Sequence, residues 1–523
     1  MLRLLKSRWE LLIGLILFTI ARLPVLRYPF YWDEAWSYAP GIKLMYLHGP
    51  SLMPNAIDVF YSRGHPLLFY AAVAGWMKIF GESHTAQHAF SLLISLCTIT
   101  AAYEVSLRLF NKRIALFTLI LLPLHVMFYV QSTFLLPEIM VALFSLVTIY
   151  FYVTGRSILT FICCTALMLT KESGMVMGLV LGIHSLYSLA NKEEDFKNRL
   201  ANFLALSAAG VAIGFYFLLQ KKLNGWYFYP EHTGYIQLDT KLTWTKLIYA
   251  LDIVFNHDYH LFHLLLLLAI VVAVHLRDIR YAVPVLPGYL MYVTIEDKFS
   301  WLPRKFLFAI LLASLAFTTY QYVQLSGIVS KVRTKFIYLS VLFICAYLAF
   351  TCINFFTSRY LICFLVFVLI LAAAWFDLYI TMLYRTIYYL TLACMLLSCY
   401  YCFKYDIGVG DVNLGAFDGI VVEENMVRYF ENAHLYDKNI ATVSFQIKEI
   451  LQKPYAGFLH SDSTFKNISY DTSQTTDYVA TDNIRSDVHA DSRYDSLAKS
   501  PEYHLVYKFE KGRSWAMVFE KVK

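Results

Sequence analysis

Long apolar runs, separated by short polar segments, fill the chain from Trp9 to Phe403. The runs are about as long as a membrane-spanning helix and lack the alternation of a strand. A helix satisfies its own backbone hydrogen bonds, which hydrocarbon cannot do. The pattern therefore predicts an α-helical polytopic membrane protein. Roughly thirteen spans are expected, at 9–26, 88–108, 114–131, 138–154, 157–171, 174–190, 201–220, 260–276, 281–296, 305–323, 336–355, 360–380 and 386–403.

Basic residues distinguish the two sides of the predicted membrane. Lys and Arg occur in every segment on the side of the N-terminus, beginning with Arg3, Lys6 and Arg8. The other side carries the longer aromatic loops of mixed charge, 27–87 and 221–259. Because short cytoplasmic loops hold the excess of cations, we expect the N-terminus inside and the C-terminus outside. Residues 66–80, within the first outer loop, are expected to form a helix along the membrane surface.

The sequence changes character after residue 405. The stretch "YHLVYKFEKGRSWAMVFEKV" predicts two strands around the turn "EKGRS", and residues 424–435 are helical in pattern. We therefore expect a transmembrane catalytic domain over 1–405, with the outer loop 27–87, and a small extracytoplasmic α/β domain over 406–523.

The composition supports the membrane assignment. Hydrophobic residues make up 59% of the chain and charged residues 15%, whereas soluble domains carry about 25% charged residues. The net charge of +7 is what cytoplasmic loops of a membrane protein produce. It is not evidence for a nucleic-acid partner, and none is expected.

Two adjacent acids, Asp33 and Glu34, follow the first span in "RYPFYWDEAWSYAP". They are predicted to lie in an outer loop at the boundary between lipid and water. A carboxylate at this position could act as a general base on a hydroxyl group. The alternative is that Asp33 caps the next helix.

Further charged residues lie at the outer ends of the predicted spans. The candidates are Arg63 and His65 in "YSRGHPLLFY", Glu138 in "LLPEIM", Lys171 in "LTKESGM", Lys221 in "LLQKKLNGW" and Arg359 in "FFTSRYLICF". Each has a simpler explanation: a favourable helix dipole for Glu138, a loop salt bridge between Lys171 and Glu172, and headgroup contact or snorkelling for the other cations. Together, carboxylates and cations at one membrane face suit a reaction in which a base activates a hydroxyl while cations hold a lipid phosphate as the leaving group.

The order of these motifs resembles the GT-C superfamily of glycosyltransferases. The sequence is most similar to protein mannosyltransferases and to bacterial transferases that add aminoarabinose to lipid A. The resemblance rests on "DEAWSYA", "HPLLFYAAVAGWMKIFG", "LLPE", "LTKESG" and "SRYL", and it covers most of residues 9–380. The family pattern "HPPL" is "HPLL" here.

The resemblance implies an inverting transfer of a sugar from a polyprenyl-phosphate donor to an extracytoplasmic protein, lipid or glycan. Asp33 corresponds to the catalytic base of the family, Glu34 to its neighbour and Glu138 to a second acid. His65, Lys171 and Arg359 correspond to positions near the donor phosphate, and Arg63 and Lys221 are added here as further candidates. A divalent metal stays open, because some members use one and others do not, and no dedicated cage is evident.

A transporter or a flippase for lipid-linked sugars is the alternative function. Such proteins carry ionisable residues in the middle of their spans. Here the predicted span centres are nearly free of charge, with Glu104 among the few exceptions, which favours the glycosyltransferase. We expect it in a prokaryotic inner membrane, with its active site on the extracytoplasmic face.

Overall fold

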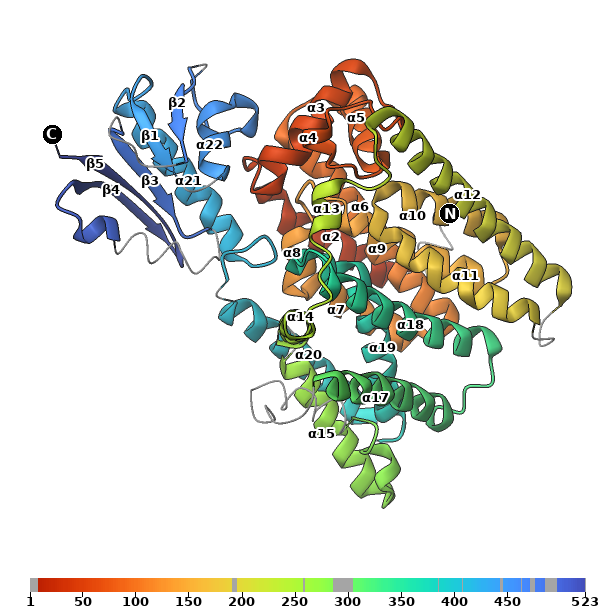
Figure 1. The fold of residues 1–523 in the computed structure, drawn as a ribbon. Coiled ribbons are helices and arrows are strands. Elements are labelled where there is room, and N and C mark those ends of the chain that lie inside the picture. Colours follow the sequence, from red (N-terminus) through yellow and green to blue (C-terminus); the bar gives the residue numbers. More distant parts are fainter. Residues whose placement is uncertain are drawn as a thin grey trace.

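The computed structural model describes the chain in ten segments. They cover residues 8–190, 195–256, 259–285, 304–383, 385–406, 408–442, 445–461, 463–470, 476–484 and 496–522. The first five hold a bundle of helices, and the last five hold most of a smaller unit built around a sheet (Figure 1).

Helices and short turns make up the larger part. Its first half contains α2 (Trp9–Arg22), η1 (Leu23–Arg27), η2 (Glu34–Tyr38), α3 (Ala39–His48), α4 (Val59–Ser62), α5 (Leu68–Phe80), α6 (His84–Leu109), α7 (Lys112–Leu124), α8 (Val126–Gln131), α9 (Glu138–Val153), α10 (Ser157–Thr170), η3 (Glu172–Gly174) and α11 (Met175–Ala190). Its second half contains α12 (Phe196–Asn224), α13 (Pro230–Gly234), α14 (Thr240–Asn256), α15 (Tyr259–Leu276), η4 (Ile279–Tyr281), α17 (Arg304–Leu325), α18 (Lys331–Ile353), η5 (Ser358–Leu361), α19 (Ile362–Thr381) and α20 (Arg385–Tyr405).

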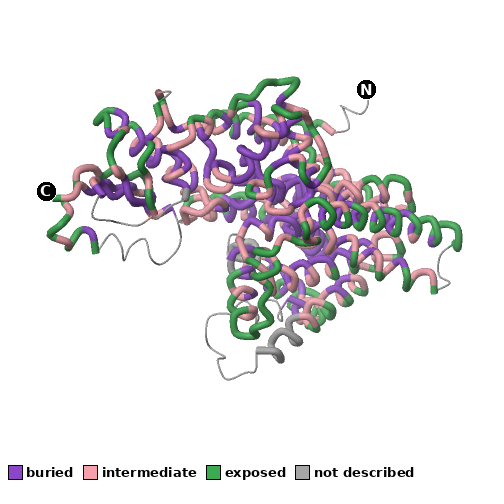
Figure 2. The backbone as a smooth tube through the Cα atoms, turned by 45° about the horizontal axis from the view of Figure 1, so that its top comes forward, coloured by how far each residue is buried: buried purple, intermediate pink, exposed green. Residues whose placement is uncertain are grey.

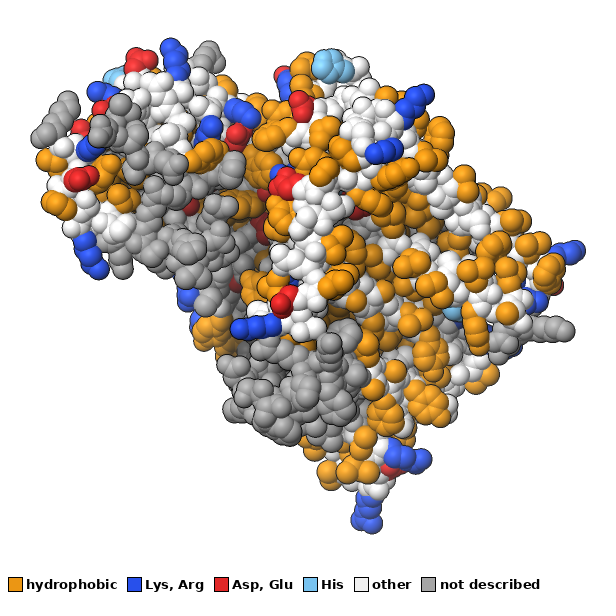
Figure 3. Space-filling model, in the orientation of Figure 1, with side chains coloured by type: hydrophobic (Ala, Val, Ile, Leu, Met, Phe, Trp, Pro, Cys, Tyr) orange, Lys and Arg blue, Asp and Glu red, His pale blue; other side chains and the backbone are white. Residues whose placement is uncertain are grey.

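Several of these helices have the length and composition of a membrane span. Among the described residues, seven are long and apolar enough: Trp9–Arg27, His84–Leu109, Glu172–Ala190, Phe196–Asn224, Lys331–Ile353, Ser358–Thr381 and Thr386–Tyr405. Large apolar side chains stay exposed on them, including Leu17, Val211 and Phe215, and hydrophobic side chains cover much of the bundle surface in Figure 3. An apolar exterior of this extent fits lipid contact. The polytopic helical fold is thus confirmed, while the number of thirteen spans and their orientation stay predictions.

The structure differs from the expected spans in two places, and a third expected span is largely untested. The run 114–131 is divided between α7 and α8, since Pro123 lies in the last turn of α7 and His125 is extended. The expected outer loop 221–259 contains the helix α14, whose apolar residues are too dispersed to form a continuous run. Most of the expected span 281–296 lies outside the described residues.

The C-terminal part contains a five-stranded sheet. Its strands are β1 (Asn439–Thr442), β2 (Asn467–Ser469), β3 (Tyr478–Asp482), β4 (Tyr503–Lys511) and β5 (Ser514–Lys521), in the order β2-β1-β3-β5-β4. β1 pairs in parallel with β2 and β3, and β4 and β5 form the expected antiparallel hairpin. The helices α21 (Gly415–Asn432) and α22 (Phe445–Gln452) and the turn η6 (Pro454–Ala456) complete it. The predicted helix and hairpin, and hence an α/β unit, are confirmed.

This C-terminal part packs against the first loop of the bundle. One apolar core contains residues from both, including Phe30, Ile42 and Tyr70 from the first part and Ile420 and Val518 from the second. Buried segments continue from the bundle interior into the sheet (Figure 2). The division at residue 405 stays a prediction, and the shared core shows that the C-terminal part holds the loop after the first span in place.

Candidate functional site

A strained turn positions the first acid of the loop. Trp32 has a φ of 51°, a left-handed conformation that bulky residues rarely adopt. The single π-helical turn η2 follows directly, and the Asp33 side chain makes no capping hydrogen bond to it. Instead, Oδ1 of Asp33 accepts a hydrogen bond from Trp36 Nε1 at 2.7 Å. The capping explanation for Asp33 is therefore wrong, and its other oxygen faces a cation. Strain of this kind is often found at functional sites.

That cation is Arg359, which joins three carboxylates. Its Nη2 donates to Oδ2 of Asp33, and its Nη1 donates to Oδ2 of Asp411 at 2.7 Å. Its Nε lies 3.4 Å from Oε1 of Glu138. The Arg359 side chain is 6% exposed, so these pairs lie in a region with little water and their geometry is well defined. The short turn η5 places Arg359 directly before the buried helix α19.

A second cation, Lys171, completes the group. Its Nζ donates to Oε1 of Glu138 at 2.7 Å, and both side chains are buried. Lys171 Nζ also lies 4.1 Å from the centre of the Tyr360 ring. Among the described residues, Oε2 of Glu138 has no hydrogen-bond partner. A buried carboxylate oxygen without a partner is energetically costly. A ligand that donates a hydrogen bond to this oxygen would remove that cost.

Asp33, Glu138, Lys171, Arg359 and Asp411 are called the ion-pair cluster below. With all groups ionised, three carboxylates oppose two cations, so the cluster carries one surplus negative charge. Burial raises the pKa of Asp411 above its usual value although Arg359 lies beside it. An anionic ligand could therefore contact Arg359 only by taking the place of a carboxylate or by lying alongside it.

Beside the cluster, three further side chains from separate segments lie together: His65, Glu172 and His232. Nδ1 of His65 lies 2.6 Å from Oε2 of Glu172, directly after Lys171 in the chain. The ring of His232, on α13, is centred 5.0 Å from that of His65. Burial and the neighbouring His65 lower the pKa of His232 to about 3. Because Lys171 pairs with Glu138 and Glu172 with His65, the alternative explanation of a mutual salt bridge between Lys171 and Glu172 is wrong.

Glu34 occupies a different environment from its neighbour Asp33. Its side chain is fully buried, and its Oε2 accepts a hydrogen bond from the backbone N–H of Tyr31 at 2.9 Å. Its Oε1 accepts from the backbone N–H of Leu135 and lies 3.2 Å from Nε2 of His88. These contacts fasten the loop after α2 to α6 and to the segment before α9. Both carboxylate oxygens of Glu34 are thus occupied by the protein.

Two predicted cations make their contacts elsewhere. Arg63 pairs with Glu231 at 2.7 Å and lies over the rings of Trp36 and Tyr229. Lys221 is exposed and donates to the carbonyl of Gly225, at the end of its own helix, at 2.6 Å. The structure therefore brings Asp33, Glu138, Lys171 and Arg359 together. His65 lies beside this group, through Glu172, and Arg63 pairs with Glu231 outside it.

Asp411 and His232 were not among the predicted site residues. Asp411 follows α20 in the stretch "GVGDVN", and its backbone carbonyl accepts a hydrogen bond from Gln131 at 2.6 Å. Nearby, the hydroxyl of Tyr31 donates to the carbonyl of Val409 at 2.8 Å. A lone acid six residues after a span carries no recognisable pattern. His232 lies in "YPEHTG", where a His beside an acid in a predicted outer loop was the available signal.

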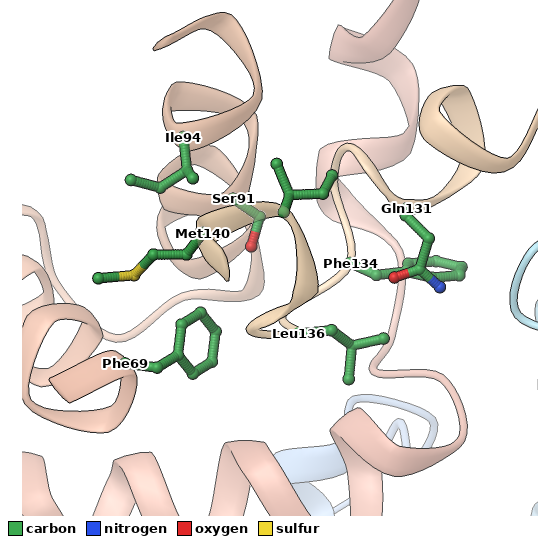
Figure 4. Close-up of a pocket in the computed structure, with 8 residues that line it drawn as sticks. Phe69, Ser91, Ile94, Gln131, Phe134, Leu136 and Met140 are labelled. Atoms are coloured by element: carbon green, nitrogen blue, oxygen red, sulfur yellow. The ribbon is translucent and has the colours of Figure 1, made fainter. Parts of the chain in front are cut away.

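A narrow crevice lies near the residues that hold Glu34, and it is too small to admit a water molecule. It is lined by Phe69, Ser91, Ile94, Gln131, Phe134, Leu136, Ile139 and Met140. Figure 4 shows Ser91 and Gln131 as the polar side chains among those labelled. The lining is mostly apolar and includes no member of the ion-pair cluster. The crevice is therefore not the centre of the candidate site.

Comparisons with known proteins give one family match. The model of the family described as dolichyl-phosphate-mannose-protein mannosyltransferase matches residues 64–216. A search among curated protein sequences found no match. Among solved structures, ArnT from Cupriavidus metallidurans in the apo state is similar over 96% of this chain and 97% of that chain, with 14% identity and a TM-score of 0.42. The archaeal oligosaccharyltransferase AglB from Archaeoglobus fulgidus is similar over 98% of this chain and 74% of that chain, with 12% identity and a TM-score of 0.47.

The matched segment includes part of the site. It carries His65, Glu138 and Lys171, and it excludes Asp33 and Arg359. The resemblance to GT-C protein mannosyltransferases, predicted from the motifs, is thus confirmed for residues 64–216 of this chain.

Proposed function

We propose that the protein is an integral-membrane glycosyltransferase that moves a sugar from a polyprenyl-phosphate donor to an extracytoplasmic acceptor. The observation that carries this proposal is the position of Arg359 between Asp33 and Glu138, with Lys171 paired to the same oxygen of Glu138. A proton acceptor and two cations are thereby held in one partly enclosed site. The family match over residues 64–216 supports the same class of reaction.

Asp33 is the proposed general base. It is 15% exposed and lies at the start of η2, so an acceptor hydroxyl can approach it from the aqueous side. Asp33 takes the hydroxyl proton as the oxygen attacks the anomeric carbon of the donor sugar, and the bond from that carbon to the phosphate oxygen breaks. Attack on the face opposite the phosphate inverts the configuration at the anomeric carbon.

Lys171 and Arg359 are proposed to bind the phosphate that leaves. Both are donors held in place by carboxylates, so they need little reorganisation when negative charge develops on the leaving oxygen. Oε1 of Glu138 contacts both cations. Because a phosphate monoester is a stable anion, the leaving group requires no general acid.

The remaining predicted residues are given supporting roles. Glu34 positions the loop that carries Asp33, since both of its oxygens contact the protein. Arg63 and His65 lie at the edge of the site, where they can face the donor phosphate or the loop that covers it. Lys221 is the outermost candidate, and its exposed position suits contact with lipid headgroups. The site is proposed to face the outside of a prokaryotic inner membrane.

The experiment is a transfer assay with a panel of radiolabelled polyprenyl-phosphate sugars, using membranes that contain the protein or an empty vector. The proposal predicts that at least one donor yields a labelled acceptor and free polyprenyl phosphate. Movement of label across the bilayer with the bond between sugar and phosphate intact would instead indicate a flippase. Absence of transfer from every hexose, pentose and aminosugar donor would contradict the proposal.

A further inference from the structure

His65, Glu172 and His232 place three metal-ligating side chains at one point. One ligand atom from each lies within 4.8 Å of the other two. His65 is buried, and Glu172 and His232 are half-buried. Tetrahedral ligands about 2.1 Å from zinc lie about 3.4 Å apart, so small side-chain rotations would bring all three into bonding range.

The backbone around these residues is shaped to hold them together. Gly64 has a φ of +72°, and a Cβ atom there would lie 2.8 Å from both the Trp226 ring and Cβ of Tyr229. The loop before α13 therefore rests directly on the residue next to His65. The hydroxyl of Tyr216 donates to the carbonyl of His65 at 3.2 Å, which fixes this loop to α12 as well.

A tight turn fixes Glu172, the carboxylate among the three ligands. A Cβ atom at Gly174 would lie 2.6 Å from the carbonyl oxygen of Leu167, so only glycine allows η3 to fold back onto α10. This turn holds Lys171 toward the ion-pair cluster and Glu172 toward His65. The two groups of charges are thus joined through adjacent residues.

The charge balance of the region favours a bound cation. The ion-pair cluster has one surplus negative charge, and with His65 and His232 neutral the carboxylate of Glu172 raises the surplus to two. Uncompensated charge away from water is costly. A divalent cation would remove the surplus, and it would leave the site better suited to an incoming phosphate.

We propose that His65, Glu172 and His232 bind a divalent transition-metal ion, with Zn²⁺ the best match to two imidazoles and one carboxylate. Three protein ligands of these types leave a fourth zinc position for water or for an oxygen of a substrate. The ion fastens α13 and the loop before it to the first outer loop beside the ion-pair cluster. This inference goes beyond the proposed sugar transfer, because metal binding is measured without any substrate.

The test is the metal content of the full-length protein, purified in detergent through a tag that contains no histidine. After incubation with ZnSO₄ and removal of free metal, elemental analysis should find one zinc ion per chain in the wild type. His232→Ala should lose most of this zinc, because it removes one of three ligands. The matched control is His48→Ala, which alters an exposed histidine at the end of α3 and should keep the zinc.

A second measurement separates metal binding from misfolding. Zn²⁺ should raise the thermal unfolding midpoint of the wild type and of His48→Ala, because a ligand that binds the folded state stabilises it. It should not raise that of His232→Ala, which is expected to fold because His232 lies on a short surface helix. A wild type without stoichiometric zinc would overturn the inference, and so would a His232→Ala variant that binds as much zinc as the wild type.

Discussion

Nη1 of Arg359 lies 2.7 Å from Oδ2 of Asp411, and this ion pair ties the start of α19 to the segment that follows α20. The carbonyl of Asp411 accepts a hydrogen bond from Gln131, at the end of α8. The segment leading into the sheet thus contributes directly to the candidate site. The C-terminal part therefore helps to orient Arg359, together with Asp33 and Glu138, in addition to packing on the loop that carries Asp33.

Removing the charge of Asp411 should strengthen phosphate binding. In Asp411→Asn, Arg359 loses one of the carboxylates that compete with a phosphate, while an amide of the same shape stays in place. At the effective dielectric constants of protein surfaces, a unit charge a few ångströms away contributes a few kcal/mol or less. We expect the affinity for polyprenyl phosphate to rise about tenfold, which corresponds to about 1.4 kcal/mol.

Titration of the purified protein with polyprenyl phosphate, followed by native mass spectrometry, measures this change. Asp437→Asn, at an exposed position of the same C-terminal part, should leave the affinity unchanged. A tenfold weaker affinity in Asp411→Asn would show that Asp411 helps binding by orienting Arg359 more than it opposes binding by its charge.

The pair formed by Lys171 and Glu138 should be strongly coupled in stability. Lys171→Met removes the closest partner of a fully buried carboxylate, and breaking such a pair costs about 3–5 kcal/mol. The double variant Lys171→Met with Glu138→Gln should recover much of this loss, since the buried charge is then removed as well.

A double-mutant cycle of unfolding in detergent checks this expectation. It compares the wild type, both single variants and the double variant. Additive losses in the double variant would mean that the two side chains do not stabilise one another. The exposed pair of Arg428 and Glu424, 2.8 Å apart on α21, serves as the reference and should show a coupling below about 1 kcal/mol.

Glu423 should make stability depend on pH. Its side chain is fully buried on α21, and burial together with nearby Asp482 raises its pKa well above 4.5. Above about pH 4.5, the folded state therefore keeps a proton on Glu423 that the unfolded state has released. The free energy of unfolding should fall as the pH rises through the interval between the two pKa values.

Glu423→Gln should remove this dependence. The amide keeps the hydrogen-bonding shape beside Gln446 without a buried charge, so the variant should melt higher than the wild type at about pH 8 and similarly at about pH 4. Thermal unfolding monitored at several pH values measures the effect. In Glu424→Gln, the control at the adjacent position, the pH profile should follow the wild type, and an equally flat profile there would argue against Glu423 as the cause.

Much of the fold could be predicted because apolar runs and strand patterns are local signals. The runs gave the helices α6, α12, α18 and α19, and the stretch around "EKGRS" gave the hairpin of β4 and β5. The parallel pairing of β1 with β2 and β3 could not be predicted, because those strands are short and their partners are distant in sequence. The break at Pro123 was missed because the residues on both sides are equally apolar.

The candidate site was only partly predictable for a similar reason. Asp33, Glu138, Lys171 and Arg359 each stand at the end of an apolar run, where a charge is conspicuous. The different roles of Asp33 and Glu34 depend on the backbone at Trp32 and on η2, which direct neighbouring side chains to opposite surroundings. Asp411 could not be predicted, because it reaches Arg359 only through the path of the chain after α20, which no local pattern indicates.

The most direct test of the central proposal is sugar transfer by Asp33→Asn and Asp33→Glu from the active radiolabelled donor. Both variants should fold and should bind polyprenyl phosphate. We predict that Asp33→Asn lowers the transfer rate by about 10²–10⁴-fold, the usual contribution of a general base. Asp33→Glu, which keeps a carboxylate, should retain more activity. Transfer by Asp33→Asn at the wild-type rate would contradict the assignment of Asp33 as the base.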